Sequence, residues 1–460
     1  MKSFRLSSAL ARSASVIAVS ICFVSSGAAF AQEAAPAEND EIIVTGVRAA
    51  LERAMDIKRE SDGVVDAISA EDIGKFPDTN LAESLQRIPG VSISRVNGEG
   101  SQVTVRGFGP SFNLVTVNGR QLATSNVNAV GGDQGVDFSR STSRSFDFSN
   151  LASEGVSRLE VYKTGRAANP SGGIGASINI ITQRPLDGNQ DGLRGSVGAK
   201  LLYDTTKKLE DVTPELSGVL SWSNPDDTVG VSVFGSYQKR ESAAVSATSN
   251  DWNIRPFSAM PGRGTGTVLT NAPTDPSQLV SVPNDSRYHY SESSRERINA
   301  QMTLQFKPVD TLTITADGMF AQNKIDEERM DQTNWFNRPF DTATFDGNPI
   351  VATTTFLSEG SGYGVKDIGF EQQYRATKST LTSYGLNAAW ELADTLTLSL
   401  DGNHSKSKSL PNSKNGASST LVGFGAPVVD AHSVDYSGPI PLQNWVLNDA
   451  TRGNNNGVLD

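Results

Sequence analysis

The chain has 460 residues, and its 51 acidic side chains outnumber its 40 basic ones, which gives a formal net charge of −11. A surface that binds a nucleic-acid backbone needs a basic excess, so we expect no nucleic-acid partner. The composition, with 42 glycines and 7% aromatic residues, fits a secreted all-β protein as well as an outer-membrane β-barrel, because barrel strands alternate apolar and polar residues and are only mildly hydrophobic in bulk.

The first segment, residues 1–31, has the three-part layout of a secretory signal peptide. Basic residues precede an apolar stretch over residues 14–24, and small residues follow up to Ala31, after which we expect cleavage. A transmembrane anchor is the alternative, but serines interrupt the apolar stretch, which is shorter than the ~20 residues that span a bilayer. Cys22, the only cysteine, lies in this leader, so the mature chain is predicted to contain no disulfide, thiolate metal site or cysteine nucleophile.

Residues 32–47 are predicted to be a disordered tail. The tail contains one β-prone strip, made of Glu41, Ile42, Ile43, Val44, Thr45 and Gly46. An extended strip with free backbone donors and acceptors can be captured as an added strand by a partner that has an exposed sheet edge. The alternative is that the strip forms the first strand of the domain that follows.

Residues 48–185 are predicted to form a compact mixed α/β domain. Asn80 precedes an apolar pattern at helical spacing, and Glu83 lies three residues further on, which is typical of a short capped helix. Brief β-branched runs follow this helix. Between two of them, the pair Asn118 and Gly119 predicts a two-residue hairpin turn.

The strip and this domain carry motifs in a fixed order: “DEIIVTG”, “LAESLQRIPGVSISR”, “VTVRGFG”, “VTVNGRQLA” and “SRLEVYKTGRAANPSGGIGASINIITQRP”. In this order and spacing they resemble the plug domain of TonB-dependent outer-membrane receptors. Residues 68–91 are most similar to a large subfamily of α-proteobacteria and xanthomonads, in which several members are linked to carbohydrate uptake. The resemblance implies that residues 41–46 are the TonB box, that TonB and its inner-membrane complex are partners, and that the chain lies in the lipid of a Gram-negative outer membrane.

After residue 185 the sequence alternates between apolar and polar residues in seven stretches, and we interpret each as part of a strand of about ten residues. The stretches are residues 193–203, 216–222, 229–237, 298–306, 312–320, 384–390 and 396–400. Short turns join the second stretch to the third, the fourth to the fifth and the sixth to the seventh. Residues 242–297 and 323–382 are predicted to be long loops. This asymmetry is typical of a transmembrane antiparallel β-barrel with its long loops outside the cell, which we assign to residues 193–460; a soluble β-sandwich is the alternative.

A plug of roughly 140 residues has an expected radius of gyration of about 14 Å, so it needs a wide barrel. An eight-stranded barrel is filled by its own side chains, whereas barrels that enclose a plug have about 22 strands. Because only the first seven or so are predicted here, we expect the sequence to be the amino-terminal fragment of a receptor roughly twice as long. Unpaired edge strands would then be an aggregation hazard.

The resemblance also implies two residues that hold the plug in the barrel. Arg106, in “VRGFG”, matches an arginine that plugs of the family direct at glutamates on the inner barrel wall. Lys163 lies where a second arginine is frequent, and a lysine keeps the charge but loses the bidentate fork of a guanidinium. The alternative for Arg106 is an ordinary exposed strand residue beside a glycine turn.

No catalytic site, metal site or cofactor is predicted. His289, His404 and His432 do not have metal-ligand spacing with one another, and the sequence has no G-x-S-x-G nucleophile motif. The resemblance to TonB-dependent receptors implies an active-transport receptor, so we interpret the chain as a receptor and not as an enzyme. A secreted soluble all-β protein that acts on carbohydrate is the remote alternative.

Aromatic residues in the predicted loops are the candidate ligand contacts. They are Trp252, Tyr288, Tyr290, Trp335 and Phe336. Such side chains could stack on sugar rings or on catecholates, or they could pack the loops against one another. The subfamily resemblance favours an oligosaccharide as the ligand, and a ferric siderophore or a corrinoid is the alternative.

Overall fold

The computed structural model describes residues 47–69, 80–96, 98–124, 145–167, 169–187, 191–206, 212–249, 251–360, 362–414, 416 and 419–447. The predicted signal peptide and the strip of residues 41–46 lie outside this set. All described residues belong to one compact unit, Gly46–Asp460. Within the described residues, no helix is both long and apolar enough to cross a membrane.

Residues 47–187 fold into a small mixed α/β domain, which we call the N-domain. Its elements are α1 (Val47–Glu60), β1 (Val65–Ser69), α3 (Leu81–Leu85), β2 (Val91–Val96), β3 (Glu99–Val105), η1 (Pro110–Phe112), β4 (Asn113–Val117), β5 (Arg120–Gln121), η3 (Phe148–Asn150), β6 (Val156–Tyr162) and β7 (Ala176–Thr182). The described strands form a five-stranded sheet in the order β1-β6-β7-β4-β5 and a separate β2-β3 hairpin. The predicted mixed α/β class of this domain is confirmed.

Two local predictions in the N-domain are also confirmed. The Asn80 side chain caps α3, because its Oδ1 accepts hydrogen bonds from the backbone N–H groups of Ala82 and Glu83 at 3.0 and 3.3 Å. Asn118 and Gly119 have φ angles of 52° and 81°, as a two-residue type I′ turn requires, and they join β4 to β5 as an antiparallel pair.

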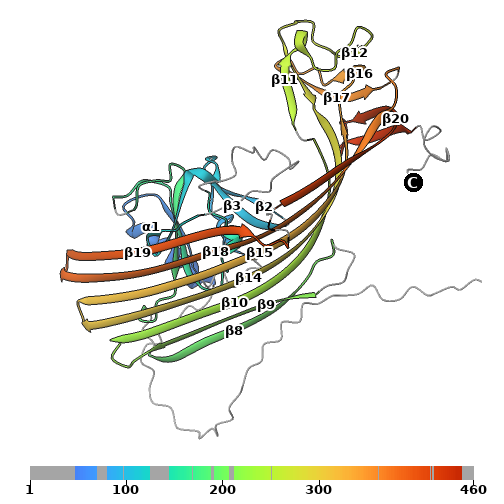
Figure 1. Cartoon of the computed structure of the whole chain (residues 1–460). Coiled ribbons are helices and arrows are strands. Elements are labelled where there is room, and N and C mark those ends of the chain that lie inside the picture. The colour runs from blue at the N-terminus through green and yellow to red at the C-terminus, as the bar shows by residue number, and fades with distance from the viewer. Residues whose placement is uncertain are drawn as a thin grey trace, which may run out of the picture. The chain divides into compact units, whose positions relative to one another are not determined.

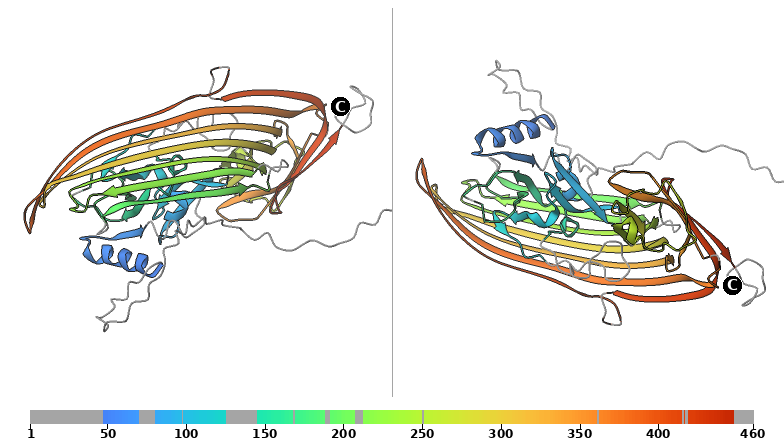
Figure 2. Two further views of the ribbon diagram at one scale, coloured as in Figure 1. Left: turned by 90° about the horizontal axis from the view of Figure 1, so that it is seen from below. Right: turned by 90° about the horizontal axis from the view of Figure 1, so that it is seen from above.

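The strands after residue 191 form a second layer, which we call the wall sheet. Its long strands are β8 (Gly192–Tyr203), β9 (Val212–Ser223), β10 (Val229–Thr248), β14 (Asp285–Val309), β15 (Leu312–Trp335), β18 (Lys366–Ala393) and β19 (Leu396–Pro411), followed by β20 (Ser419–Asp435) and β21 (Leu442–Leu447). The long strands lie side by side and antiparallel, with the N-domain against one face of the sheet (Figures 1 and 2). Met319, Ala321 and Leu381 of the wall belong to the N-domain's apolar core cluster, so apolar packing joins the two layers.

The seven predicted strands are confirmed, since each lies within one of β8, β9, β10, β14, β15, β18 and β19. Their alternation separates two faces. On β14, Met302, Leu304 and Phe306 are 44–47% exposed, whereas Thr303 and Gln305 are buried. An exposed apolar face is suited to lipid, and we call these seven stretches of outward apolar residues the apolar band.

The predicted strand number and loop bounds are wrong. The described residues of the wall sheet form 14 strands, and the strands on either side of the predicted loops extend far into residues 242–297 and 323–382. The β14–β15 register, for example, runs without interruption from the pair Asp285 and Trp335 to the pair Phe306 and Ile314. Beyond the apolar band these strands are mostly polar, so apolar alternation ends although backbone pairing continues.

The shortened loops contain strands of their own, which we call the outer region. These are β11 (Trp252–Pro256), β12 (Val268–Thr270), β13 (Leu279–Pro283), β16 (Phe340–Phe345) and β17 (Val351–Glu359). Phe257, Val280, Phe345 and Leu357 are buried in a separate apolar cluster there. Among the described residues the wall sheet does not close, because β8 pairs only with β9 and β19 only with β18. A closed barrel of about 22 strands stays a prediction.

Candidate functional site

The candidate functional site is the interface between the N-domain and the polar face of the wall sheet. Inward side chains of β14 satisfy backbone groups of the N-domain there. The Ala152 N–H donates to Asn299 Oδ1 at 2.7 Å, and the Leu186 N–H donates to Gln305 Oε1 at 2.9 Å. Asn299 and Gln305 are buried, so any movement of the N-domain away from the wall must replace these bonds.

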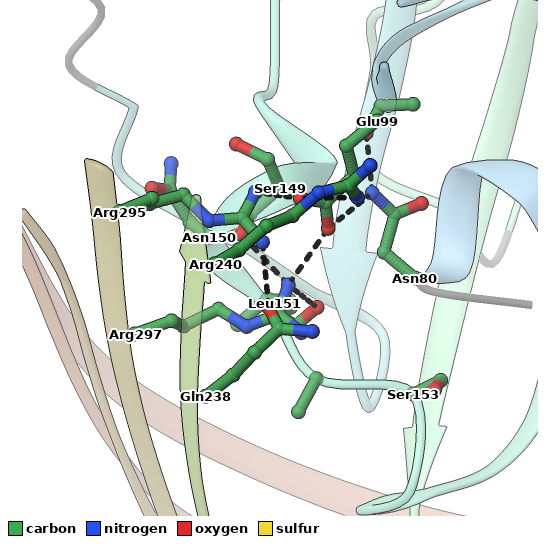
Figure 3. Close-up of polar contacts among 12 residues, drawn as sticks. Asn80, Glu99, Ser149, Asn150, Leu151, Ser153, Gln238, Arg240, Arg295 and Arg297 are labelled. Atoms are coloured by element: carbon green, nitrogen blue, oxygen red, sulfur yellow. Dashed lines mark hydrogen bonds and ion pairs between the residues drawn. The ribbon is translucent and has the colours of Figure 1, made fainter. Parts of the chain in front are cut away.

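One carboxylate of the N-domain lies among guanidinium groups of the wall (Figure 3). Glu99 begins β3, its side chain is 1% exposed, and it contacts Arg240 of β10 and Arg295 and Arg297 of β14. Arg297 Nη1 lies 3.3 Å from Glu99 Oε1, and Arg240 Nη1 lies 3.7 Å from Oε2, which Arg295 Nη1 also contacts. Asn80 Nδ2 donates to Glu99 Oε1 at 3.0 Å, so the residue that caps α3 also orients this carboxylate.

The charges in this cluster are unequal, because three guanidinium groups surround one carboxylate. Arg297 Nη1 also donates to the carbonyl oxygens of Ser149 and Leu151 at 2.9 and 3.3 Å. The Nε atoms of Arg240, Arg295 and Arg297 have no hydrogen-bond partner among the described residues. Burying a cation without full compensation is costly. The N-domain therefore supplies the one carboxylate that all three wall arginines contact.

In a second ionic contact the N-domain supplies the cation and the wall supplies the carboxylates. Arg120, on β5, is 8% exposed, and its Nε donates to the two carboxylate oxygens of Asp401 on β19 at 2.8 and 3.0 Å. Its Nη1 donates to Asp317 Oδ2 on β15 at 2.5 Å. Gly385 on β18 leaves room for the guanidinium, since a Cβ there would overlap it. A planar guanidinium between two carboxylates fixes the position of the β4–β5 hairpin on the wall.

A cavity of about 230 Å³ adjoins the Arg120 contact. It lies between the two layers, and its lining is polar on both sides: Asn118, Arg120 and Arg184 from the N-domain, and Thr303, Thr315, Asp317, Asn387, Ser399 and Asp401 from the wall. A polar cavity of this size can hold several waters. Water at this position would replace hydrogen bonds that are lost when the N-domain moves.

Arg106 and Lys163, the predicted contacts to wall glutamates, make their described hydrogen bonds within the N-domain. Arg106 Nη2 donates to the Gly175 carbonyl at 2.8 Å. Lys163 Nζ lies 2.5 Å from Asp66 Oδ2. Burial acts to raise the pKa of Asp66, but the hydrogen bonds and charges of Lys163 and Lys58 outweigh it and hold that pKa below its ordinary value. The contact of Arg106 and Lys163 with wall glutamates stays a prediction.

The sequence reasoning missed the residues that join the two layers, although it contained a signal for some of them. In “RERINAQMTLQ”, residues 295–305, the apolar alternation begins at Ile298. Extending the alternation backwards places Arg295 and Arg297 on the same strand face as Asn299, which is the buried polar face. No comparable signal marks Arg120, whose partner Asp401 lies 281 residues further along the chain.

The five aromatic candidates lie in the outer region or at the outer ends of wall strands, and Tyr288 and Tyr290 belong to β14 and not to a loop. Four of them contact neighbouring residues: Trp252 contacts Tyr436, Tyr288 contacts Pro441, Tyr290 contacts Glu292 and Phe336 contacts His432. Trp335 is 41% exposed, with a guanidinium 5.6 Å from its ring centre. Ligand contact by these residues stays a prediction.

His432, on β20 of the wall sheet, is 2% exposed. It stacks between Phe336 and Trp445 at ring-centre distances of 5.5 and 5.7 Å, and its Nε2 lies 3.1 Å from Gln443 Oε1. Burial lowers the pKa of His432 to about 3, and the positive charge of Lys366 adds to this shift. In the described part of the chain, no group of three or more His, Cys, Asp or Glu residues is placed to hold a metal ion.

Comparison with known proteins identifies the N-domain. The family described as “TonB-dependent Receptor Plug Domain” matches residues 57–177. The “Ferric enterobactin receptor PirA” of Pseudomonas aeruginosa is 33% identical over 196 residues, which cover 39% of this chain and 25% of that protein. Another protein of Pseudomonas aeruginosa, “Ferric enterobactin receptor”, is 30% identical over 161 residues, which cover 34% of this chain and 21% of that protein. The chain therefore spans a quarter or less of the length of these curated relatives.

Among solved structures, a crystal structure of a ferric enterobactin receptor mutant from Pseudomonas aeruginosa matches this chain with a TM-score of 0.40. The identity is 16%, and the match covers 84% of this chain and 57% of that one. A crystal structure of the siderophore receptor PirA from Acinetobacter baumannii matches with a TM-score of 0.34 at 13% identity, over 84% of this chain and 60% of that one.

Proposed function

We propose that the chain, whose residues 57–177 match the plug domain of TonB-dependent receptors, is such a receptor of the Gram-negative outer membrane and imports a scarce ligand through a plugged barrel with energy from TonB. The N-domain is the plug. The observation that carries the proposal is that Glu99 and Arg120 of the plug form ion pairs with the polar face of the wall, while the opposite face of the wall is apolar.

A ferric siderophore is the ligand class that the comparisons favour. Both curated relatives reported above are named as ferric enterobactin receptors. The expected oligosaccharide has only the subfamily resemblance in its favour, and neither of these relatives supports it. We therefore propose a ferric siderophore as the cargo and retain an oligosaccharide as the outcome that a direct test must exclude.

Import requires the plug to move or to deform against the wall. We propose that TonB adds the strip of residues 41–46 to its own sheet and pulls on it, because a β-prone sequence can be captured as an added strand by an exposed sheet edge. The pull must break the Glu99 and Arg120 contacts and the hydrogen bonds to Asn299 and Gln305. Backbone hydrogen bonds would hold the strip to TonB whatever ligand the receptor binds.

A proline substitution separates binding from import. In cells that express the receptor, Ile43→Pro removes a backbone donor from the strip and should abolish uptake of labelled ferric siderophore while leaving its surface binding unchanged. Glu38→Pro, in the tail before the strip, is the matched control and should transport normally. Equal uptake by the Ile43→Pro variant and the wild type would refute the role of the strip.

Ligand class is tested by binding. Purified receptor is titrated with ferric siderophores and with oligosaccharides, and quenching of intrinsic tryptophan fluorescence is followed. Saturable binding of a ferric siderophore supports the proposal. Saturable binding of an oligosaccharide alone would overturn the siderophore assignment and leave TonB-dependent import standing.

A further inference from the structure

Three guanidinium groups of the wall share one plug carboxylate as their ion-pair partner, while Glu215 of β9 stays nearby on the wall. Arg240 of β10 and Arg295 of β14 are direct cross-strand neighbours, and Arg297 of β14 lies opposite Gln238. Like charges directly opposite each other on a sheet repel, so this arrangement needs an anion. In the structure that anion is Glu99, which belongs to the plug.

When the plug moves, the three guanidinium groups stay on the wall. Arg297 then loses both the Glu99 carboxylate and the carbonyl oxygens of Ser149 and Leu151, because all of these belong to the plug. Guanidinium groups match the geometry of paired anionic oxygens. Arg297 lies on the plug-facing side of β14, as its bonds to plug carbonyls show, so the exposed cluster would face the space that the plug vacates.

We propose that Arg240, Arg295 and Arg297 form an internal binding station for the anionic oxygens of the cargo, a station that Glu99 occupies when the receptor is at rest. This inference rests on the proposed function and narrows it: the cargo carries carboxylate or catecholate oxygens with negative charge. Exchange of the Glu99 carboxylate for cargo oxygens keeps the wall arginines neutralised throughout the movement, which lowers the cost of releasing the plug.

The first experiment asks whether the station accepts a small anion. Purified receptor with Glu99→Ala is titrated with acetate and with inorganic phosphate by isothermal titration calorimetry. We expect saturable binding at least tenfold tighter than in the wild type. Glu160→Ala, which removes a buried plug carboxylate that pairs with Arg158, is the matched control and should bind like the wild type. Adding Arg295→Gln and Arg297→Gln to Glu99→Ala should remove the binding.

Equal anion binding by the wild type and the Glu99→Ala variant would overturn the proposal. So would anion binding that persists after both arginines are replaced. Because this experiment uses neither TonB nor import, a negative result leaves the proposed function standing.

The second experiment asks whether the cargo uses the station. The double variant Arg295→Gln/Arg297→Gln should slow uptake of an anionic ferric siderophore about tenfold at unchanged surface binding, and Arg295→Lys/Arg297→Lys should restore most of the rate because it keeps the charge. If the arginines only hold the plug, the Gln variant will instead admit a large antibiotic such as vancomycin without slowed uptake. That result would refute the station. Uptake that does not depend on Ile43 would instead refute TonB-driven import.

Discussion

The contact of Arg120 with the wall leads to a prediction whose size can be worked out. Arg120→Met keeps much of the length of the side chain but removes the charge that Asp317 and Asp401 share. Truncating one partner of a buried, hydrogen-bonded charge pair costs about 2–5 kcal/mol. Asp317 is 16% exposed and Asp401 is 36% exposed, so water partly solvates the remaining carboxylates. We therefore expect the lower end, about 2–3 kcal/mol.

A change of this size raises the population of the open plug by about 30- to 150-fold. The assay uses a single cysteine on the wall. Thr303, 4% exposed beneath the plug, lines the cavity beside Arg120, and Cys22 is the only native cysteine. In a Thr303→Cys background, the rate of maleimide labelling follows the open population when opening and closing are fast compared with labelling.

Three further variants test the reasoning behind this number. Arg120→Lys should label at an intermediate rate, because a lysine keeps the charge but not the fork. Gly385→Ala should also label faster than the wild type, since its Cβ would displace the Arg120 guanidinium. Gly402→Ala on β19, where a Cβ meets open space, is the matched control and should label slowly. Equal labelling rates in the Arg120→Met variant and the parent would refute the idea that Arg120 holds the plug.

Leu159→Ala, at a fully buried position in the plug core, should lower the free energy of plug unfolding by about 2–5 kcal/mol in urea titration; a change below about 1 kcal/mol would contradict this packing. Asn80→Ala should cost about 2 kcal/mol, more than a cap alone, because Glu99 also loses a donor. The neutral folded His432 has a pKa of about 3, below the unfolded value of about 6.5, so the packing around β20 should lose up to about 1.4 kcal/mol of stability per pH unit as the pH falls below 6.5. Limited proteolysis should detect this loss, and His432→Phe should abolish the dependence.

The plug could be predicted from sequence because its signals are local. The Asn80 cap and the turn at Asn118 and Gly119 each depend on residues a few positions apart. The apolar band could be predicted for a similar reason, because one face of each strand must be apolar wherever lipid lies against it. These features depend on short-range geometry or on solvent, and both leave a pattern in a single sequence.

The outer halves of the strands and the contacts to the wall could not be predicted in this way. Residues 323–335 of β15 are mostly polar and show no apolar alternation, yet their backbone pairs continuously with β14. Arg120 and Asp401 meet only because the fold brings together residues that are distant in the sequence. A strand that is polar on both faces has no hydrophobic period of two, so its sequence does not mark it as a strand. A charge pair between distant residues can be recognised only when the register of the whole sheet is known.

In the receptor that we propose, the length of the wall strands determines what the cell surface presents. β14 has 25 residues and β18 has 28, whereas about 9–11 tilted residues cross a bilayer. The surplus of roughly 15 residues extends about 50 Å along each strand. Immune receptors and bacteriophages that approach such a cell would meet rigid, hydrogen-bonded β-strands and not flexible loops. Antisera raised against the denatured polypeptide should therefore recognise intact bacteria poorly.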